Sequence, residues 1–311
     1  MEHRKLVIIG SGAAGWTAAI YAARAGLKPL VIAGMQRGGQ MLIAGEVENF
    51  PGFEDAVDGP DLMARMEAQA LRVGAEATDD IVVDLDVAAR PFKIAGEFDS
   101  WTADAVIIAT GATARWLGVP GEEDYQGSGV SACATCDGFF FKDQKVAVVG
   151  GGNTAAEEAL YLSNICTEVH LIHRRNDMRA ERILQDRIAR TKNIHFHGER
   201  TVKEIHGRMP RNEGITHLEL VSTVDGSTES LEVDGVFVAI GHDPATKPFV
   251  GKIDLDSNGY IATREGGVAT SVPGVFAAGD VADPRYRQAV TAAGFGCMAA
   301  LEVQHWLRDA V

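Results

Sequence analysis

Cysteine is scarce in this sequence, and the scarcity limits what thiols can do in the protein. The 311 residues include four cysteines, which are Cys133, Cys136, Cys166 and Cys297. Four are too few for the dense disulfide framework of a small secreted domain. Cys133 and Cys136 lie close together in the sequence, so thiol chemistry is expected there. The isolated Cys166 and Cys297 follow apolar helical stretches and are expected to pack in the core.

Long apolar runs and an excess of positive charge are also missing. No segment approaches the roughly 18 apolar residues of a membrane span. The formal net charge of -14 argues against nucleic acid as the main partner, because a phosphate backbone needs a broad cationic surface. The N-terminus passes from Met1 to Lys5 directly into residues 6–9 and a glycine cluster, without the pattern of a secretory signal. We therefore expect a cytoplasmic protein with no membrane or nucleic-acid partner.

The composition is that of a globular protein, and one βαβ pattern occurs in it twice. Hydrophobic residues make up 46% of the chain and charged residues 23%, and the length is sufficient for two domains. In the first copy an apolar strand at 6–9 precedes a glycine cluster, an alanine-rich helix at 16–25 and a strand at 29–32. In the second, a strand at 146–149 precedes glycines, a helix at 156–162 and a strand at 168–172.

Glycines at the turn of each copy predict dinucleotide binding. The first glycine permits a tight turn, the second lets the backbone approach a pyrophosphate, and the third position lets the helix pack closely on the strand. One such pattern is weak evidence, but two copies in matching context favour two bound dinucleotides. The candidate contacts are Gly10, Gly12, Ala13, Ala14 and Gly15 in the first loop, and Gly150, Gly152, Asn153 and Thr154 in the second.

The residues that follow each second strand distinguish the two ligands. The second copy continues into His173, Arg174 and Arg175, with Arg179 one helical turn later. Guanidinium groups at this position suit the 2′-phosphate of NADP(H) better than the free ribose of NAD(H). The first copy continues into Ala33, Gly34 and Met35, which carry no charge, so its ribose contacts must come from elsewhere.

The Cys133/Cys136 pair forms a C-x-x-C motif directly before Asp137. Two cysteines at this spacing can close a small disulfide and exchange two electrons reversibly. Asp137 can transfer the accompanying proton if its surroundings raise its pKa. A zinc site is the structural alternative, but it would need two more ligands at fitting spacing. Electron transfer between a nicotinamide and a disulfide needs a converter, so the first dinucleotide is expected to be FAD.

The order of segments predicts an α/β fold with two Rossmann-like dinucleotide-binding domains, the NADPH domain inserted in the FAD domain. Residues 104–111 resemble residues 234–241, since each is a buried strand that ends in glycine, and the two segments look like matching exits from the domains. Residues 275–280 form another apolar strand that returns the chain to the first domain. The expected boundaries are 1–114 and 244–311 for the FAD domain and 115–243 for the NADPH domain.

Along nearly its whole length the sequence resembles the low-molecular-weight bacterial thioredoxin reductases. The motif at 131–140 around the cysteine pair, the second glycine loop and the segment 173–179 are the most specific parts. The resemblance implies NADPH and FAD as cofactors, thioredoxin or a thioredoxin-like protein as partner, a homodimer, and Cys133, Cys136 and Asp137 as the catalytic residues. It also implies further FAD contacts from Gly39, Gln40, Asn49, Thr110, Gly111, Gly279, Asp280, Arg287, Gln288 and Ala289.

Other functions are compatible with parts of the pattern. A flavoprotein that oxidises a dithiol with oxygen would share the C-x-x-C motif but would have no use for the arginine cluster, and a ferredoxin-fed thioredoxin reductase would differ in its electron donor. A dinucleotide sensor without catalysis would not need the cysteine pair. For Phe139, Phe140 and Phe141 we expect core packing rather than a docking surface.

Overall fold

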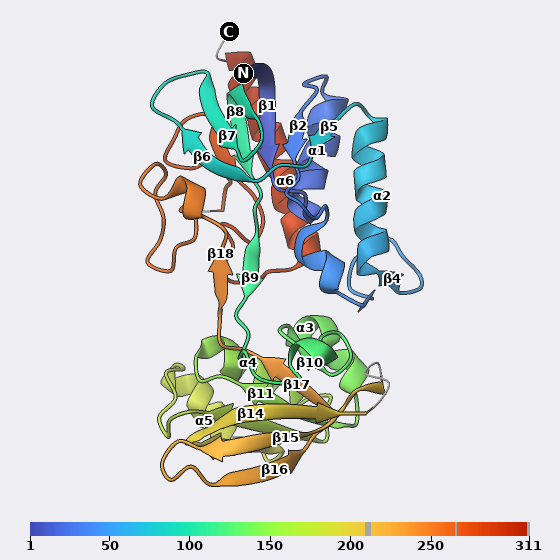
Figure 1. The fold of residues 1–311 in the computed structure, drawn as a ribbon, viewed down its shortest axis with the longest axis vertical. Helices are drawn as coiled ribbons and strands as arrows, with labels where there is room; N and C mark the ends of the chain where they lie inside the picture. Colours follow the sequence, from blue (N-terminus) through green and yellow to red (C-terminus); the bar gives the residue numbers. More distant parts are fainter. Residues whose placement is uncertain (209–212, 265, 310–311) are drawn as a thin grey trace. The chain divides into compact units, whose positions relative to one another are not determined.

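The computed structural model describes residues 1–208, 213–264 and 266–309, and the chain forms two compact units. Unit 1 contains Met1–Thr113 and Asp243–Val311, and unit 2 contains Ala114–His242. Unit 2 is therefore an insertion in unit 1 (Figure 1). The two connecting segments are β9 (Ala112–Ala114) and β18 (His242–Pro244), which pair with each other in a two-stranded sheet.

Unit 1 is built on a seven-stranded sheet with the order β5-β2-β1-β8-β7-β6, in which β19 also pairs with β8. The pairs among β5, β2, β1, β8 and β19 are parallel, whereas β8-β7 and β7-β6 are antiparallel. The strands are β1 (Glu2–Ile9), β2 (Leu30–Ile32), β5 (Glu76–Thr78), β6 (Val82–Asp86), β7 (Phe92–Gly96), β8 (Ser100–Ile108) and β19 (Val275–Ala277).

Helices and smaller elements complete unit 1. Helices α1 and α6 pack against each other, and α1 also packs against α2 (Figure 1). The elements are α1 (Ala13–Arg24), α2 (Gly59–Arg72), α6 (Ala289–Asp309), the 3₁₀ helices η1 (Gly39–Ile43) and η5 (Lys247–Phe249), and the hairpin of β3 (Glu46–Val47) and β4 (Val57–Asp58).

Both faces of the unit 1 sheet are covered, which explains the unbroken apolar run at the end of β1. Leu6 and Ile8 pack on the helix side with Trp16 of α1, which is fully buried. Val7 and Ile9 pack on the opposite face with residues such as Phe249. A strand buried on both sides reads as a continuous apolar segment rather than an alternating one.

Unit 2 combines a parallel and an antiparallel sheet. The parallel sheet has the order β10-β17-β11-β12-β13, and the antiparallel sheet has the order β14-β15-β16. The strands are β10 (Val130–Ser131), β11 (Lys145–Val149), β12 (Glu168–His173), β13 (Ile194–Gly198), β14 (Arg200–Gly207), β15 (Ile215–Ser222), β16 (Thr228–Glu232) and β17 (Gly235–Val238), and the helices are η2 (Glu123–Tyr125), α3 (Ala134–Asp137), η3 (Gly138–Phe141), α4 (Asn153–Leu162) and α5 (Arg182–Arg190).

The parallel sheet of unit 2 separates two cores. Val146 and Val148 of β11 pack against helix α4, while Ala147 and Val149 face the core shared with β14 and β15. The antiparallel sheet contributes one apolar face to that second core, including Leu218. Its other face is consequently polar and accessible to solvent.

The predicted internal repeat is confirmed by matching hydrogen bonds. Gly10 N donates to Ile32 O at 2.9 Å, and Gly150 N donates to Ile172 O at 3.0 Å. The strands β8 and β17 also occupy equivalent places. The backbone N–H of the residue after β8 donates to the last residue of β1, and the backbone N–H of the residue after β17 donates to the last residue of β11. The α/β class with two Rossmann-like units, one inserted in the other, is thereby confirmed.

The helices of the repeat begin earlier than predicted. Starts were expected at 16 and 156, but α1 begins at Ala13 and α4 begins at Asn153. Gly12 and Gly152 are the residues at the N-caps, with extended backbone, so each glycine loop passes directly into helix. The first-turn amides therefore stand at the loop, where an anionic group can use them.

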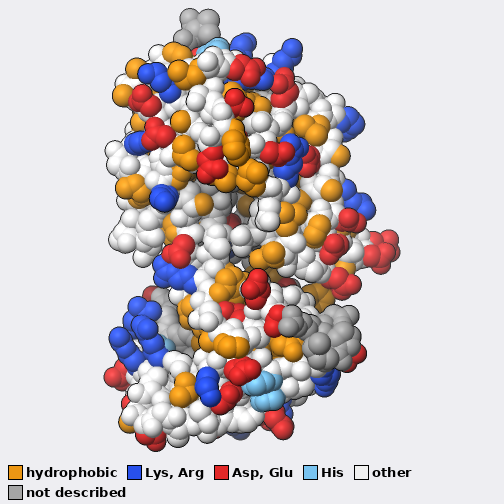
Figure 2. All heavy atoms as spheres, in the orientation of Figure 1, with side chains coloured by type: hydrophobic (Ala, Val, Ile, Leu, Met, Phe, Trp, Pro, Cys, Tyr) orange, Lys and Arg blue, Asp and Glu red, His pale blue; other side chains and the backbone are white. Residues whose placement is uncertain are grey.

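On the face drawn in Figure 2, basic and acidic side chains are interspersed over most of the surface. None of the helices in the described ranges is long and apolar enough to cross a membrane.

Candidate functional site

The first glycine loop combines positions that exclude any side chain with one that leaves space. A Cβ on Gly10 would collide with the Ala109 carbonyl oxygen, and Gly10 has a φ of 109°. A Cβ on Gly15 would collide with the carbonyl oxygen of Gly10, so the helix can approach the turn only with glycine there. At Gly12 a Cβ would meet nothing within 4 Å. Gly12 is therefore the point at which a ligand can approach the backbone.

Ser11, which the sequence did not single out, connects this loop to the chain that follows β2. Its buried hydroxyl donates to Ala33 O at 2.7 Å and accepts from Gly38 N at 3.2 Å. The connection brings the start of η1 to the loop, where a Cβ on Gly39 would lie 3.7 Å from Gly12 Cα. The predicted contact residues Gly12 and Gly39 are thus neighbours, and Gln40 follows with an exposed side chain.

Asp280 is a buried carboxyl beside the same loop. A Cβ on the preceding Gly279 would stand 2.9 Å from Ala14 Cβ, so this segment lies against the start of α1. Among the described residues, Asp280 Oδ1 has no hydrogen-bond partner. Burial, with a further contribution from Asp283, raises the pKa of Asp280 to about 6. An unpartnered buried carboxyl oxygen fits a ligand that presents hydroxyl groups.

The segment that enters α6 is held by Asp283. This buried carboxylate accepts hydrogen bonds from the backbone of Arg285 at 2.9 Å and Tyr286 at 3.0 Å. Arg287 follows with a φ of 49°, Gln288 comes next, and α6 begins at Ala289. Gln288 Oε1 accepts from Asn49 Nδ2 at 3.3 Å. The structure therefore brings together two residues that lie far apart in the sequence and that were both expected near FAD.

Thr110 and Gly111 lie just after the end of strand β8. The Thr110 hydroxyl donates to Ala245 O at 2.8 Å, and Gly111 has a φ of 71°. The Thr110 side chain is therefore engaged with the backbone of the returning chain. A contact with a cofactor from this position would use the backbone or the remaining lone pairs of the hydroxyl.

The second glycine loop repeats the first in its backbone and differs in what lies on it. A Cβ on Gly150 would stand 2.5 Å from Ala239 O, and a Cβ on Gly152 would meet nothing within 4 Å. A Cβ on Gly151 would collide with the ring of His173, which therefore packs flat on the loop. His173 is buried, and its Nε2 has no partner within the described part of the chain.

The arginine segment is tied back to the second loop through its backbone. Arg179 N donates to Gly151 O at 2.7 Å, and Ala180 N donates to the same oxygen at 3.1 Å. The side chains of Arg174, Arg175 and Arg179 are exposed, and none of them forms an ion pair with a described residue. Burial, and then the nearby arginines, lower the pKa of His173. Three cationic groups are thus available to an anionic ligand beside the loop.

Asn153 and Thr154 occupy the first turn of α4, with different environments. Asn153 Oδ1 accepts from Glu181 N at 2.8 Å, and Asn153 Nδ2 donates to Glu181 Oε1 at 3.1 Å. The Asn153 side chain therefore fixes the start of α5. Thr154 is half-buried next to the open position at Gly152.

Cys133 and Cys136 form a disulfide bond in this structure. Cys133 stands at the N-cap of the four-residue helix α3, and its carbonyl accepts from Cys136 N at 3.2 Å and Asp137 N at 3.1 Å. Ser131, another residue that the sequence did not single out, accepts from Cys133 N at 3.0 Å through its buried hydroxyl. The short helical turn therefore holds the two sulfur atoms within bonding distance.

Asp137 lies at the end of the same turn. Burial raises the pKa of Asp137, and a hydrogen bond with the Ser131 side chain partly opposes the shift. A carboxyl with a raised pKa next to a dithiol can hold a proton nearer to neutral pH than an ordinary aspartate. Proton transfer by Asp137 was predicted to require a raised pKa, and its surroundings do raise that pKa.

The aromatic residues after the cysteine pair differ from the prediction. Phe141 packs edge-to-face on Phe237, with ring centroids 5.5 Å apart. Phe139 is 59% exposed and Phe140 is 40% exposed. Core packing is therefore correct for Phe141 and wrong for Phe139 and Phe140, because η3 turns two of the three rings to solvent. Of the isolated cysteines, Cys166 is buried as expected and Cys297 is half-buried.

The chain is similar to known proteins along nearly its whole length. Residues 4–296 match the family model described as pyridine nucleotide-disulphide oxidoreductase. A thioredoxin reductase of Vibrio cholerae is 52% identical over 99% of this chain and 98% of its own. The structure of a thioredoxin reductase from Giardia duodenalis has a TM-score of 0.94 and 42% identity, with 99% of this chain and 100% of that chain covered. A Pseudomonas fluorescens protein named glucosaminate ammonia-lyase is 50% identical over 99% of this chain and 97% of its own.

Proposed function

The chain belongs to the pyridine nucleotide-disulphide oxidoreductase family, and we propose that it is an NADPH-dependent thioredoxin reductase that uses FAD. The observation that carries this proposal is the Cys133–Cys136 disulfide, which lies in the same unit as a glycine loop flanked by available guanidinium groups. Full-length similarity to thioredoxin reductases at about half identity supports it.

Unit 1 would hold FAD. The open backbone at Gly12, the neighbouring Gly39 and the unpartnered carboxyl of Asp280 fit the pyrophosphate and hydroxyl groups of that cofactor. When bound, FAD supplies the conversion between hydride transfer and thiol exchange. The residues that we assign to it are Gly10, Gly12, Ala13, Ala14, Gly15, Gly39, Gln40, Asn49, Thr110, Gly111, Gly279, Asp280, Arg287, Gln288 and Ala289.

Unit 2 would hold NADPH. The open backbone at Gly152 is suited to the pyrophosphate, and the exposed guanidinium groups are suited to the 2′-phosphate, which they can bind with bidentate hydrogen bonds. His173 packs on Gly151 and so holds the arginine segment against the loop. The residues that we assign to NADPH are Gly150, Gly152, Asn153, Thr154, His173, Arg174, Arg175 and Arg179.

The dithiol form of Cys133 and Cys136 carries out the exchange with thioredoxin. One cysteine thiolate attacks a sulfur of the thioredoxin disulfide, whose S–S bond breaks as a mixed disulfide forms. The second cysteine then attacks the first, which restores the Cys133–Cys136 bond and releases the thioredoxin dithiol. Both electrons pass to thioredoxin, and two protons accompany them.

Asp137 is proposed as the group that moves a proton during these steps. Its burial favours the protonated carboxyl, and its backbone N–H is fixed to the Cys133 carbonyl. A protonated Asp137 can donate to a departing thiolate, and the ionised form can accept the proton of a thiol that must attack.

We further propose that the protein works as a homodimer in the cytoplasm and that it has no nucleic-acid or membrane partner. The net charge of -14 supports the absence of a nucleic-acid partner. Exposed apolar side chains on α6, which include Val290, Met298 and Leu301, support an association of unit 1 with a second copy. Light scattering after size-exclusion chromatography measures the mass, and a monomer at micromolar concentration would refute the dimer.

Replacement of the cysteines tests the proposed reaction. We predict that Cys133→Ser and Cys136→Ser each lower NADPH-dependent reduction of thioredoxin by at least about 1,000-fold, because no exchange can be completed with one thiol. NADPH oxidation with an artificial electron acceptor should persist, since that reaction does not need the dithiol. Cys166→Ser and Cys297→Ser are the matched controls and should keep their activity. Full thioredoxin reduction by both cysteine-pair variants would remove the dithiol from the mechanism.

The name of the Pseudomonas relative defines a second activity to be tested. Elimination of ammonia from glucosaminate involves no disulfide exchange, so the Cys133–Cys136 pair would be superfluous to it. We expect no release of ammonia from glucosaminate above the rate in the absence of protein. Release by the wild type that persists in Cys133→Ser would show a second activity at a site other than the dithiol.

A further inference from the structure

The outer face of the antiparallel sheet in unit 2 carries a group of metal-ligating side chains. Among the residues that the structure describes, Glu204, His206 and Glu219 have ligand atoms that all lie within 4.8 Å of one another. The three side chains are half-buried. We propose that Glu204, His206, Glu219 and the adjacent His217 form a binding site for a divalent transition metal of the zinc class.

Strand register places the four side chains on one face of the sheet. Glu204 of β14 pairs with Glu219 of β15, and His206 pairs with His217. Residues two apart on one strand point to the same side, so two carboxylates and two imidazoles form a square patch. The rings of His206 and His217 are stacked, with centroids 4.4 Å apart and an interplanar angle of 8°. The intervening residues Ile205 and Leu218 are buried on the opposite face.

Hydrogen bonds fix which nitrogen of His217 is available. The Thr216 hydroxyl donates to His206 O at 3.3 Å, because a carbonyl oxygen can only accept. The same hydroxyl lies 3.0 Å from His217 Nδ1, and when its proton is directed to the His206 carbonyl it accepts from Nδ1–H. The neutral ring then carries its lone pair on Nε2. An imidazole oriented in this way through its other nitrogen is the usual arrangement of a histidine that binds a metal.

The charge of the patch favours a cation. Glu204 and Glu219 stand directly opposite each other, and like charges in such a pair are destabilising. Lys203 Nζ donates to Glu219 Oε1 at 2.8 Å and neutralises one of the two charges. Lys203 is the additional residue at the register shift between Val202 and Glu204. Its side chain therefore reaches the same face of the sheet as the patch. One negative charge remains, and a divalent ion would displace the lysine.

The donor set selects the class of metal. Imidazole nitrogen with carboxylate oxygen suits zinc and its neighbours rather than calcium or magnesium, which take oxygen ligands. Ligand atoms about 2.0 Å from a tetrahedral zinc stand roughly 3.3 Å apart, so rotation of the carboxylate side chains must close the remaining distance. His217, at the edge of the patch, also lines a hollow of about 640 Å³ together with Thr216.

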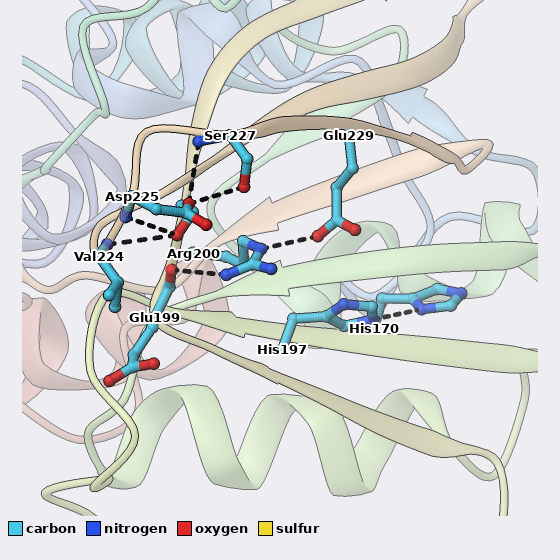
Figure 3. Close-up of polar contacts among 9 residues, drawn as sticks. His170, His197, Glu199, Arg200, Val224, Asp225, Ser227 and Glu229 are labelled. Atoms are coloured by element: carbon cyan, nitrogen blue, oxygen red, sulfur yellow. Dashed lines mark hydrogen bonds and ion pairs between the residues drawn. The ribbon is translucent and has the colours of Figure 1, made fainter.

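A second histidine group in unit 2 provides a matched control. His170 Nδ1 and His197 Nε2 are hydrogen-bonded to each other at 3.0 Å (Figure 3). The His195 ring stacks on His170. Among the described residues, this group does not bring three ligand atoms within 4.8 Å of one another. His195→Gln therefore tests whether any histidine-rich surface of this unit binds the metal.

Titration calorimetry with zinc chloride tests the proposal on the full-length, FAD-loaded protein with Cys133–Cys136 oxidised, after chelator treatment and dialysis. We expect one zinc ion per chain with a Kd of about 10 μM or lower. His206→Gln and Glu219→Gln should each weaken binding by about 100-fold, and Thr216→Val by about 10-fold. Lys203→Gln should strengthen binding, since it removes the competing cation. His195→Gln should leave binding unchanged.

X-ray absorption at the zinc edge identifies the ligand atoms. A shell of nitrogen and oxygen with no sulfur is expected, whereas sulfur ligands would assign the ion to a cysteine and overturn the proposal. A wild-type Kd above about 100 μM would overturn it as well, as would equal affinity in wild type, His206→Gln and Glu219→Gln. A far-UV circular dichroism spectrum and a thermal unfolding curve like those of the wild type show that each variant is folded, and the gain expected for Lys203→Gln does not depend on a loss of structure.

Discussion

The two glycine loops of this protein have the same backbone conformation and differ in the side chains that pack against them. In both loops the first glycine faces the carbonyl oxygen of an equivalent strand, and the glycine at the helix N-cap faces open space. In unit 1 the hydroxyl of Ser11 connects the loop to Gly38, whereas in unit 2 the ring of His173 covers Gly151. The turn is therefore set by backbone geometry, and we expect the ligand to be set by the side chains around each loop.

The ionisable groups near the two loops also differ, since they are acidic at the first loop and basic at the second. Asp280 lies beside the first loop, in a buried position that raises its pKa to about 6. Arg174, Arg175 and Arg179 are exposed in the segment tied to the second loop. A carboxyl suits hydroxyl groups and guanidinium suits phosphate. The comparison thus predicts FAD in unit 1 and NADPH in unit 2.

Removal of the arginines should have the largest effect on this difference. We expect the double variant Arg174→Ala with Arg175→Ala to reduce the preference for NADPH over NADH, measured as a ratio of kcat/KM, by about 100-fold or more. Each charge-assisted hydrogen bond to the phosphate contributes about 1.5–3 kcal/mol. Arg187→Ala with Arg190→Ala, which removes two basic residues of α5, is the control and should keep the preference. Unchanged discrimination in the first variant would place the 2′-phosphate elsewhere.

Equivalent glycine substitutions in the two loops should separate the two ligands. Both N-cap glycines have backbone angles that alanine can adopt, and the added methyl group would meet no protein atom within 4 Å. We expect Gly152→Ala to raise the KM for NADPH by about 10-fold, because the methyl group would obstruct the pyrophosphate. Flavin content should stay at the wild-type level.

Gly12→Ala should give the opposite result, with lower flavin content and a KM for NADPH that is unchanged in the fraction that retains flavin. Absorbance of the purified proteins gives the flavin-to-protein ratio, and steady-state kinetics give the KM. If Gly12→Ala impaired NADPH binding and Gly152→Ala impaired flavin binding, the assignment of the two units would be reversed.

Acid should destabilise the second βαβ copy more than the first, which is the smallest of the expected effects. Strand β2 carries no ionisable residue, whereas the equivalent β12 carries His170. Burial, followed by the neighbouring His197 and His195, lowers the pKa of His170 to about 4. The unfolded chain therefore binds more protons than the folded one between about pH 6.5 and 4, so stability falls as the pH falls through this range.

The expected loss is about 2–3 kcal/mol between pH 7 and pH 4. Thermal unfolding of the wild type and of His170→Gln at a series of pH values measures it. The variant should show a weaker dependence of Tm on pH in this range than the wild type does. Equal pH dependence of the two proteins would show that His170 is not the group responsible.

The sequence was sufficient for the repeat because the features that reveal it are local. Gly10, Gly12 and Gly15 are close together in the sequence; the turn requires glycine at Gly10 and Gly15, and Gly12 leaves space for a ligand. The arginines of unit 2 stand at a fixed place after the second strand, so their position could also be inferred. The class of fold and the order of its two units follow from such short-range patterns.

Contacts between distant residues could not be read in this way. The hydroxyl of Ser11 meets Gly38, and Asn49 meets Gln288 across most of the chain, and neither pair has a distinctive spacing. The patch around His206 depends on the register of β14 and β15 and on two irregularities in it. Phe139 is exposed because of the local turn of η3, which apolar character alone does not predict.

The most direct test of the account is an anaerobic titration of the purified flavin-containing protein with NADPH, followed by addition of oxidised thioredoxin. The account predicts that flavin absorbance bleaches, that more than one NADPH is consumed per FAD because the Cys133–Cys136 disulfide is also reduced, and that the colour returns with thioredoxin. Bleaching that thioredoxin does not reverse would contradict the assigned partner. If NADPH left the absorbance unchanged, the proposed electron donor would be wrong.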